Sequence, residues 1–362
     1  MDAQRDFAQR VASGVDTSSR HRSPALLAQA RALVPLDTLR ARAAARVLCA
    51  ILEPAGATGE GQRPVCHLHD ALVHELLAWF KADFFTWVNS PPCCRCGGST
   101  RYRGLSPPTE EETAGLASRV ESYECESCSA ETRFPRYNHP GVLLRTRRGR
   151  CGEWANAFTL VANACGLTAR YCLDFSDHVW TEIWAPHLSR WTQADSCEAA
   201  RDTPLLYEQG WGKRLAYVLA FEAQGPVADV TPRYVISWRE ALGRRAALPE
   251  AWVSQHLEQA TQRQIAIAPP RRREAMLQRA RADATQLSAC VVAGGGALPV
   301  VQELPGRQSG AIEWRAARGE LGESASARQR RIAIRYSRRV VQRLAAALAK
   351  AMTDVQERGE QQ

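Results

Sequence analysis

Cys151 lies at a position where the predicted backbone structure would make a thiol more reactive. The residues after it place apolar side chains at helical spacing: Trp154, Phe158, Val161, Ala162 and Cys165. This spacing predicts a helix with Cys151 in its first turn. The partial positive charge at a helix N-terminus lowers the pKa of a thiol placed there, and a thiolate is a strong nucleophile. The alternative is a buried structural cysteine, because cysteine is among the residues most often buried.

Two further polar residues lie downstream in strand-like segments. Residues 176–184, which contain His178, alternate apolar and polar side chains, and Asp195 follows the similar run 190–194. On neighbouring antiparallel strands, the histidine would take the thiol proton and later protonate the leaving group, while the aspartate would fix the imidazole tautomer. Taken singly, His178 could equally be a half-buried histidine with no catalytic role, and Asp195 could equally be a turn residue or a helix cap. The order of cysteine helix, histidine strand and aspartate strand favours a catalytic set.

Four cysteines have the spacing of a metal site. Cys93 and Cys96 form one C-x-x-C pair, Cys125 and Cys128 form another, and Cys94 is the odd member. Two such pairs separated by a loop are typical of a closed tetrahedral Zn²⁺ site, and four thiolate ligands leave no position open for catalysis. Two disulfides or four free thiols are the alternatives, and disulfides are disfavoured in a cytosolic protein. We therefore expect structural zinc, with Cys94 outside the ligand set.

The composition fits a globular enzyme without a membrane span. The 362 residues carry a formal net charge of +9, and nearly all of the positive charge is arginine. No apolar run is long enough to cross a bilayer, and the polar N-terminus lacks the apolar core of a signal peptide, although its arginines and serines leave a transit peptide open. The charge fits either a compositional bias or acidic partners such as nucleic acid.

Helical periodicity surrounds the segments that carry these residues. The predicted helices cover residues 24–53, 70–89, 250–266, 271–287 and 326–357. Asp70 is the expected N-cap of the second helix. Near the end of that helix, Trp79 or Trp87 is either a core residue or a cleft residue that helps to hold an oxyanion. The glycine- and proline-rich residues 291–325 are predicted to be loop or disordered.

These elements divide the chain into five consecutive parts. They are an N-terminal helical extension (1–69), a catalytic core (70–240) with a zinc-binding insertion (90–132), a helical part (241–290), a loop or disordered stretch (291–325) and a C-terminal helix (326–362). The last helix has an apolar stripe on an arginine-rich background. That stripe serves either to bind a partner or to pack on the enzyme body.

The stretch from Leu76 to Tyr234 resembles the cytoplasmic peptide:N-glycanases, which are members of the transglutaminase-like superfamily. The matching segments are 76–89, 93–96, 124–128, 133–140, 147–158, 177–184, 190–198 and 229–235. One departure is Pro232, where the family has a different residue before Arg-Tyr, and this departure affects a turn rather than the chemistry. The phrase at 306–310, with Trp314 and residues 318–320, also resembles the tail of fungal and plant glycanases, without a physical role that the sequence explains.

The resemblance implies a fold and a site. The fold is α+β, with a transglutaminase-like (papain-like) core that has an antiparallel sheet, a helix whose N-terminus carries the nucleophile, an inserted zinc-binding subdomain, and helical N- and C-terminal extensions. The implied catalytic triad is Cys151, His178 and Asp195. The residues implied to line the glycan and peptide cleft are Trp180, Trp191, Glu198 and Trp211. The family's four-cysteine zinc sites are structural.

The resemblance also implies an activity and its setting. The expected reaction is hydrolysis of the amide between an N-glycan and asparagine in misfolded glycoproteins, through a thioester, with conversion of asparagine to aspartate during glycoprotein quality control. The expected location is the cytoplasm and also the nucleus. The expected partners are a denatured N-glycoprotein and a ubiquitin-like proteasome shuttle factor bound through the terminal helices.

Other functions on the same fold stay open at this point. A transglutaminase or a cysteine protease would use the same three residues, since nothing in their types distinguishes one amide from another. A non-catalytic DNA-repair or degradation scaffold would be favoured by the zinc pairs and the charge. The intact Cys151, His178 and Asp195 argue against it, as does the lack of a basic patch interleaved with aromatic residues of the kind that binds single strands.

Overall fold

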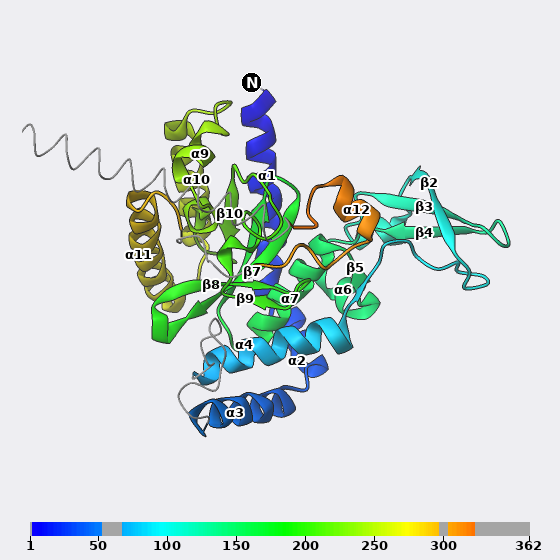
Figure 1. Ribbon diagram of the computed structural model, residues 1–362, viewed down its shortest axis with the longest axis horizontal. Helices are drawn as coiled ribbons and strands as arrows, with labels where there is room; N and C mark the ends of the chain where they lie inside the picture. Colours follow the sequence, from blue (N-terminus) through cyan, green and yellow to red (C-terminus); the bar gives the residue numbers. More distant parts are fainter. Residues whose placement is uncertain (1, 53–66, 297–302, 323–362) are drawn as a thin grey trace, which may run out of the picture.

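A six-stranded antiparallel sheet forms the centre of the molecule in the computed structural model, which describes residues 2–52, 67–296 and 303–322 (Figure 1). Its strand order is β11-β10-β6-β7-β8-β9. The strands are β6 (Ala169–Asp174), β7 (His178–Ala185), β8 (Arg190–Asp195), β9 (Ala200–Arg201), β10 (Val218–Phe221) and β11 (Val227–Asp229). Helix α7 (Cys151–Ala164) packs against this sheet, and almost all of its residues are buried. The predicted α+β, transglutaminase-like fold class is confirmed.

Three helices precede the core, where the sequence predicts one. Helix α1 (Asp2–Ser19), which was not predicted, is followed by a short 3₁₀ turn (Arg20–Arg22), α2 (Pro24–Leu33) and α3 (Leu36–Leu52). The predicted helix 24–53 is therefore wrong as one element, because Pro35 cannot donate a helical hydrogen bond and holds Val34 extended. Phe7 and Val11 of α1 pack into a cluster with β10.

The predicted helix 70–89 is correct only in its first half. Helix α4 spans Leu68–Trp79, and a wider π-helical turn over Phe80–Phe84 ends it. The chain then extends as β1 (Thr86–Trp87), which pairs in parallel with β5 (Arg148–Gly149) directly before α7. The predicted Asp70 cap is wrong, because His67 accepts the capping bond, whereas the Asp70 carboxylate pairs with Arg201 and His187.

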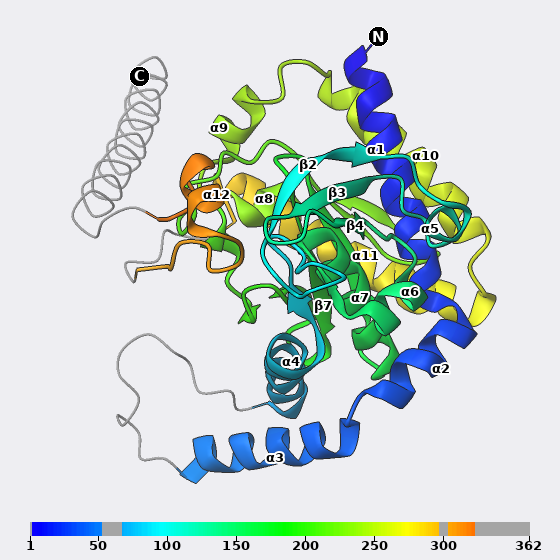
Figure 2. The ribbon, with the colours of Figure 1, turned by 90° about the vertical axis from the view of Figure 1, so that its right-hand side faces the viewer.

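A small three-stranded sheet projects from the core in Figure 1 and lies in front of it in Figure 2, and the cysteine pairs are in its loops. It has the order β2-β3-β4, with β2 at Thr100–Ser106, β3 at Val120–Cys125 and β4 at Glu131–Pro135. The short helix α5 (Glu110–Ala114) lies between β2 and β3, and α6 (Pro140–Thr146) leads back to the core.

The remaining helices lie over the other face of the sheet, at its β11 edge or, for the last of them, beside the small sheet. They are the 3₁₀ turns Pro186–Leu188 and Pro204–Leu206, α8 (Thr231–Tyr234), α9 (Trp238–Gly243), α10 (Glu250–Ala266), α11 (Pro270–Val292) and α12 (Ile312–Ala317). Helix α10 matches its predicted span, and α11 extends its predicted span at both ends. The predicted helix 326–357 lies outside the described residues. None of the described helices is long and apolar enough to cross a membrane.

A buried ionic network fastens α11 to the sheet. Arg170 of β6 contacts Glu182 of β7 at 2.6 Å and Asp283 of α11 at 2.7 Å. Arg233 of α8 contacts Glu182 at 2.7 Å and also pairs with Asp283. Two carboxylates and two guanidiniums therefore balance one another away from water, and the loss of any one would leave a buried charge without its partner.

Candidate active site

The first turn of α7 is held by interactions that fix the backbone around Cys151. The Glu153 carboxylate accepts the Arg150 backbone N–H at 3.0 Å and pairs with the Arg136 guanidinium at 2.6 Å. Gly149 is required here, because a Cβ at this position would lie 2.3 Å from Cβ of Glu153. The extended backbone of Arg150 then turns into the helix, so that Cys151 occupies its first position.

The structure brings Cys151, His178 and Asp195 together. His178 is the first residue of β7 and Asp195 is the last residue of β8, so their side chains meet at one end of two adjacent strands. Nε2 of His178 lies 2.8 Å from Oδ2 of Asp195, and the imidazole acts on the Cys151 thiol strongly enough to lower the pKa of that thiol. Because Nε2 is used by the aspartate, Nδ1 is the nitrogen left for proton exchange with the thiol.

The charges of the three groups support one another. Burial acts to raise the pKa of Cys151, but the hydrogen bond to His178 and the nearby positive charge outweigh it, so the pKa lies below that of an ordinary thiol. Burial alone would lower the pKa of His178, yet the Asp195 charge raises it overall. The pKa of Asp195 is lowered in turn, because the imidazole charge outweighs its burial. The arrangement favours a thiolate beside a charged imidazole.

Two tryptophans that the resemblance places in the cleft are fully buried, and the ring of one of them, Trp180, lies 5.7 Å from the His178 ring. Trp180 is 0% exposed, stacks on Tyr207 at 4.2 Å and donates from Nε1 to the Tyr234 hydroxyl. Trp191 is 1% exposed and lies beneath the Arg170 guanidinium on the side of α11. Because both faces of this sheet are covered, neither ring is available to a ligand in this structure.

The other two expected cleft residues contact the site without lining its open pocket. The Trp211 ring lies 4.8 Å from the His178 ring and is 1% exposed. The Glu198 carboxylate accepts the backbone N–H groups of Gln308 and Ser309 at 2.9 and 3.1 Å. Glu198 therefore holds the later segment 303–322 against the site.

A pocket of about 500 Å³ opens directly on Cys151. One wall comes from Trp87, Asn89 and Ser90, a second from strands β2 and β3, and a third from Ala311 and Trp314 of the later segment. Trp87, one of the two expected oxyanion candidates, therefore borders the pocket. Trp79, the other candidate, packs in the core.

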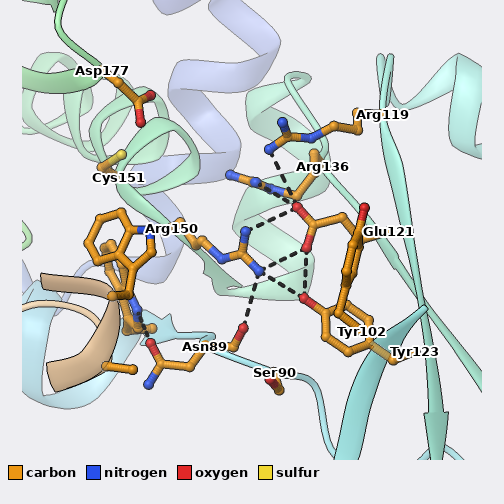
Figure 3. Close-up of a pocket in the computed structure, with 13 residues that line it drawn as sticks. Asn89, Ser90, Tyr102, Arg119, Glu121, Tyr123, Arg136, Arg150, Cys151 and Asp177 are labelled. Carbon is orange, nitrogen blue, oxygen red and sulfur yellow. Dashed lines mark hydrogen bonds and ion pairs between the residues drawn. The ribbon is translucent and has the colours of Figure 1, made fainter. Parts of the chain in front are cut away.

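A cluster of charges forms the side of the pocket next to the small sheet. Figure 3 shows the guanidiniums of Arg119, Arg136 and Arg150 turned toward the Glu121 carboxylate. The Tyr123 hydroxyl donates to the same carboxylate at 2.7 Å. Because Arg150 precedes Cys151, this network couples the small sheet to the start of α7.

Sequence reasoning missed two side chains that touch the triad. The Tyr207 hydroxyl donates to Oδ2 of Asp195 at 3.1 Å, and no pattern around Tyr207 indicates this contact. Arg307 lies 3.5 Å from Nδ1 of His178, within the predicted loop or disordered stretch 291–325. The described residues 303–322 are loop apart from α12, and they lie against the site. The only signal was the tail motif at 306–310.

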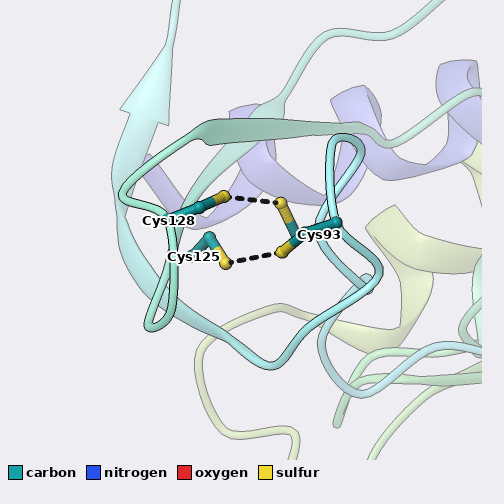
Figure 4. Close-up of side chains that lie close together, drawn as sticks. Cys93, Cys125 and Cys128 are labelled. Atoms are coloured by element: carbon teal, nitrogen blue, oxygen red, sulfur yellow. Dashed lines mark hydrogen bonds between the residues drawn. The ribbon is translucent and has the colours of Figure 1, made fainter.

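The four predicted metal-site cysteines lie together at the end of the small sheet where β2 and β4 begin and β3 ends (Figure 4). Sγ of Cys93 lies 3.6 Å from Sγ of Cys128, Sγ of Cys96 lies 3.4 Å from that of Cys125, and all four sulfurs fall within 4.8 Å of one another. Thiolates around one tetrahedral Zn²⁺ would be ~3.8 Å apart, so the donor set fits a metal ion. The Cys94 thiol instead donates to the Glu131 carbonyl oxygen.

Comparison with known proteins gives consistent matches over the core. Residues 100–196 match the transglutaminase-like superfamily, and residues 176–274 match the Rad4 transglutaminase-like domain. The peptide-N(4)-(N-acetyl-beta-glucosaminyl)asparagine amidases of Gallus gallus and Homo sapiens are 42% and 41% identical over 83% of this chain and 44% of their own length. That of Yarrowia lipolytica is 39% identical over 80% of this chain and 77% of its own. This chain therefore spans less than half the length of the animal relatives.

Solved structures give a weaker likeness. A Rad4–Rad23 complex bound to a 6-4 photoproduct UV lesion aligns with 80% of this chain and 57% of the matched chain, with a TM-score of 0.46 and 15% identity.

Proposed function

This chain belongs to the peptide-N(4)-(N-acetyl-beta-glucosaminyl)asparagine amidase family, and on this premise we propose that it hydrolyses the amide between an N-glycan and an asparagine side chain. The proposed substrate is a misfolded or denatured glycoprotein in glycoprotein quality control. The observation that carries the proposal is the contact of His178 with Asp195 at 2.8 Å beside a thiol at a helix N-terminus. An intact set of this kind would have no purpose in a non-catalytic scaffold.

The proposed chemistry follows from which imidazole nitrogen is free. The Cys151 thiolate attacks the side-chain amide carbon of the glycosylated asparagine, and the C–N bond breaks as Nδ1 of His178 gives its proton to the departing glycosylamine nitrogen. The neutral imidazole then takes a proton from water, which attacks the thioester. Aspartate and the free thiol result, and the glycosylamine loses ammonia in solution. Asp195 keeps the imidazole oriented and supports its charge in each step.

The pocket beside Cys151 supports a carbohydrate substrate. Trp87 and Trp314 border it, and sugar rings pack favourably on aromatic faces. Glu121 and the arginines around it offer acceptors and donors for hydroxyl groups on the opposite side. These residues replace Trp180 and Trp191 as the proposed sugar-contacting side chains.

We further infer that the metal is zinc and that it is structural. Four thiolates around Zn²⁺ leave no coordination position for water or substrate. When bound, the ion would hold together the loops at the outer end of the small sheet, whose Tyr102, Glu121 and Tyr123 border the pocket. The eleven cysteines of the described residues form no disulfide, which supports a reducing cytoplasmic or nuclear location. The proposed shuttle-factor contact of residues 326–362 lies outside the described residues.

A single assay separates the proposed activity from its alternatives. The full chain is incubated with denatured and with native glycoprotein in isotopically heavy water, and the products are read by mass spectrometry. Glycan release with heavy oxygen in a new aspartate is expected from the wild type and from Cys49→Ala, an exposed cysteine on α3, but not from Cys151→Ala. Isopeptide crosslinks would instead indicate a transglutaminase, backbone cleavage a protease, and no product at all a scaffold.

A further inference from the structure

Residues 303–322 form a segment that lies against the catalytic end of the sheet. The Glu198 carboxylate binds its backbone at Gln308 and Ser309, and Arg318 donates to the Asp177 carboxylate at 3.0 Å. Asp177 directly precedes His178. The segment is therefore anchored on the loops that follow Asp195 and precede His178, and α12 within it lies close to the small sheet (Figure 1).

The Arg307 side chain of this segment is buried against the triad. It is 0% exposed, and its guanidinium lies 4.8 Å from the Trp211 ring, 4.5 Å from the Trp314 ring and 5.8 Å from the Trp87 ring. Nη1 pairs with Glu320 at 2.9 Å, and Nη2 lies 3.5 Å from Nδ1 of His178. Nδ1 is the nitrogen that exchanges a proton with Cys151.

The segment is shaped to hold that guanidinium in place. Nε of Arg307 donates to the Ser309 hydroxyl at 3.1 Å. Gly310 turns the chain with a φ of +97°, and a Cβ there would lie 2.7 Å from the Trp314 ring. Ser309, Gly310 and Trp314 of the tail motif thus together hold the Arg307 side chain in place.

Resting on the proposed role of Cys151 as nucleophile, we propose that Arg307 is a positioning residue of the catalytic set, whose caged positive charge stabilises the Cys151 thiolate. The segment 303–322 then completes the active site instead of only covering it. A buried guanidinium requires compensating negative charge. Besides Glu320, the negative group whose charge acts most strongly on Arg307 is the thiolate of Cys151, and the Arg307 charge in turn lowers the pKa of that thiol.

The charged groups around the thiol define the test. Those that act most strongly on Cys151 are His178 from β7, Asp177 from the preceding turn and Arg307. Tyr171 from β6 and Cys197 also interact with the thiolate, and burial raises the pKa of both. Of these, Arg307 alone carries a positive charge that does not depend on pH. Replacing it should therefore move the pH at which Cys151 becomes reactive, without a change in the number of titrating groups.

The experiment follows alkylation of Cys151 by iodoacetamide as a function of pH, with the labelled peptide identified by mass spectrometry. Arg307→Met should raise the midpoint of the Cys151 profile by about one pH unit or more, and Arg307→Lys should restore part of the shift. The matched control is Arg318→Gln, which removes a guanidinium from the same segment and should move the midpoint far less. Thermal unfolding of each variant checks that it is folded.

A variant of the counterion gives a shift of opposite sign. Glu320→Gln removes the negative charge that offsets Arg307, so the midpoint for Cys151 should fall. A purely structural role for Arg307 predicts that Arg307→Met and Glu320→Gln shift the midpoint together or not at all, and either result would overturn the proposal. If Arg307→Met does not fold, Arg307→Lys and Glu320→Gln decide the question.

The alkylation profile is independent of the proposed amidase activity. Opposite shifts in a chain that releases no glycan would refute the proposed function while leaving the role of Arg307 intact. If the wild type releases glycan but the folded Arg307→Met variant has the same alkylation midpoint as the wild type, the proposed function stands and the proposed role of Arg307 is refuted.

Discussion

Replacement of Asp195 by asparagine tests the assigned roles of the two imidazole nitrogens. In the structure, Oδ1 of Asp195 accepts the backbone N–H of Cys197 at 2.9 Å, while Oδ2 contacts Nε2 of His178 and the Tyr207 hydroxyl. The amide oxygen of an asparagine would keep the backbone bond. Its NH₂ group would then face His178 and donate to Nε2, which forces the imidazole proton onto Nδ1.

That proton faces Cys151, so His178 can no longer accept the proton of the thiol. We expect the single-turnover rate of glycan release to fall by about 10⁴-fold, because the analogous change in a serine triad has this effect through the same tautomer reversal. This loss corresponds to about 5 kcal/mol of transition-state stabilisation. The fold should persist, since the side chain keeps its volume and its backbone hydrogen bond.

The assay is glycan release from a denatured glycoprotein, with enzyme in excess and thermal unfolding measured in parallel. Tyr207→Phe is the matched control, because it removes one hydrogen bond to Asp195 but leaves the tautomer unchanged, and it should cost about tenfold or less. A folded Asp195→Asn enzyme that stays within about tenfold of the wild type would refute the assignment of Nε2 to Asp195 and Nδ1 to Cys151.

Three further outcomes are expected. In a pH–rate profile, glycan release should decline at acid pH as the thiolate of Cys151 is protonated, and the midpoint of this decline should lie below the ordinary pKa of a thiol. A midpoint at or above the ordinary pKa would contradict the lowered pKa of Cys151. Asp283→Asn should lower the free energy of urea unfolding by about 3–5 kcal/mol, since it leaves two buried guanidiniums short of a carboxylate, and a loss below about 1 kcal/mol would show the network to be dispensable. Because the lowered pKa of Asp283 means that the unfolded chain binds the extra proton, this contribution is present above pH ~4 and is lost as the pH falls through the folded pKa. Removal of the metal by a chelator, or the substitution Cys96→Ser, should raise the KM for glycoprotein by disordering the small sheet beside the pocket. The Cys94→Ser variant should bind metal as the wild type does. If Cys94→Ser and Cys96→Ser lose metal binding equally, Cys94 is a ligand.

The positions of the three candidate catalytic residues could be predicted because each occupies the end of a regular element. A turn, a helical period and two alternating strands locate Cys151, His178 and Asp195 from local sequence alone. The four-cysteine group could be predicted in the same way, because C-x-x-C spacing is a local pattern. The structure brings the three candidate catalytic residues together at one end of β7 and β8, and it brings the four cysteines together at the small sheet.

The features that the sequence did not predict depend on contacts between residues far apart in the chain. Alternation predicts which side chains share a face of β7 and β8, but not that α8 and α11 cover those faces and bury Trp180 and Trp191. The end of α4 at Trp79 depends on pairing of the following strand with Arg148–Gly149, about 60 residues later. The position of the loop residues 303–322 depends on Glu198, 110 residues before Gln308, and no local pattern predicts this contact.

The anchoring of residues 303–322 has a consequence for how the protein folds. The contacts of this segment with Glu198, His178 and Asp177 span 110, 129 and 141 residues, among the longest-range side-chain contacts of the described chain. Contacts that close such long loops form slowly, because their chain entropy is lost before they contribute stability. During synthesis the core strands emerge well before Arg307 does. The nascent protein should therefore acquire its sheet first and a fully reactive thiol last, so that the nucleophile matures only after nearly the whole described chain is in place.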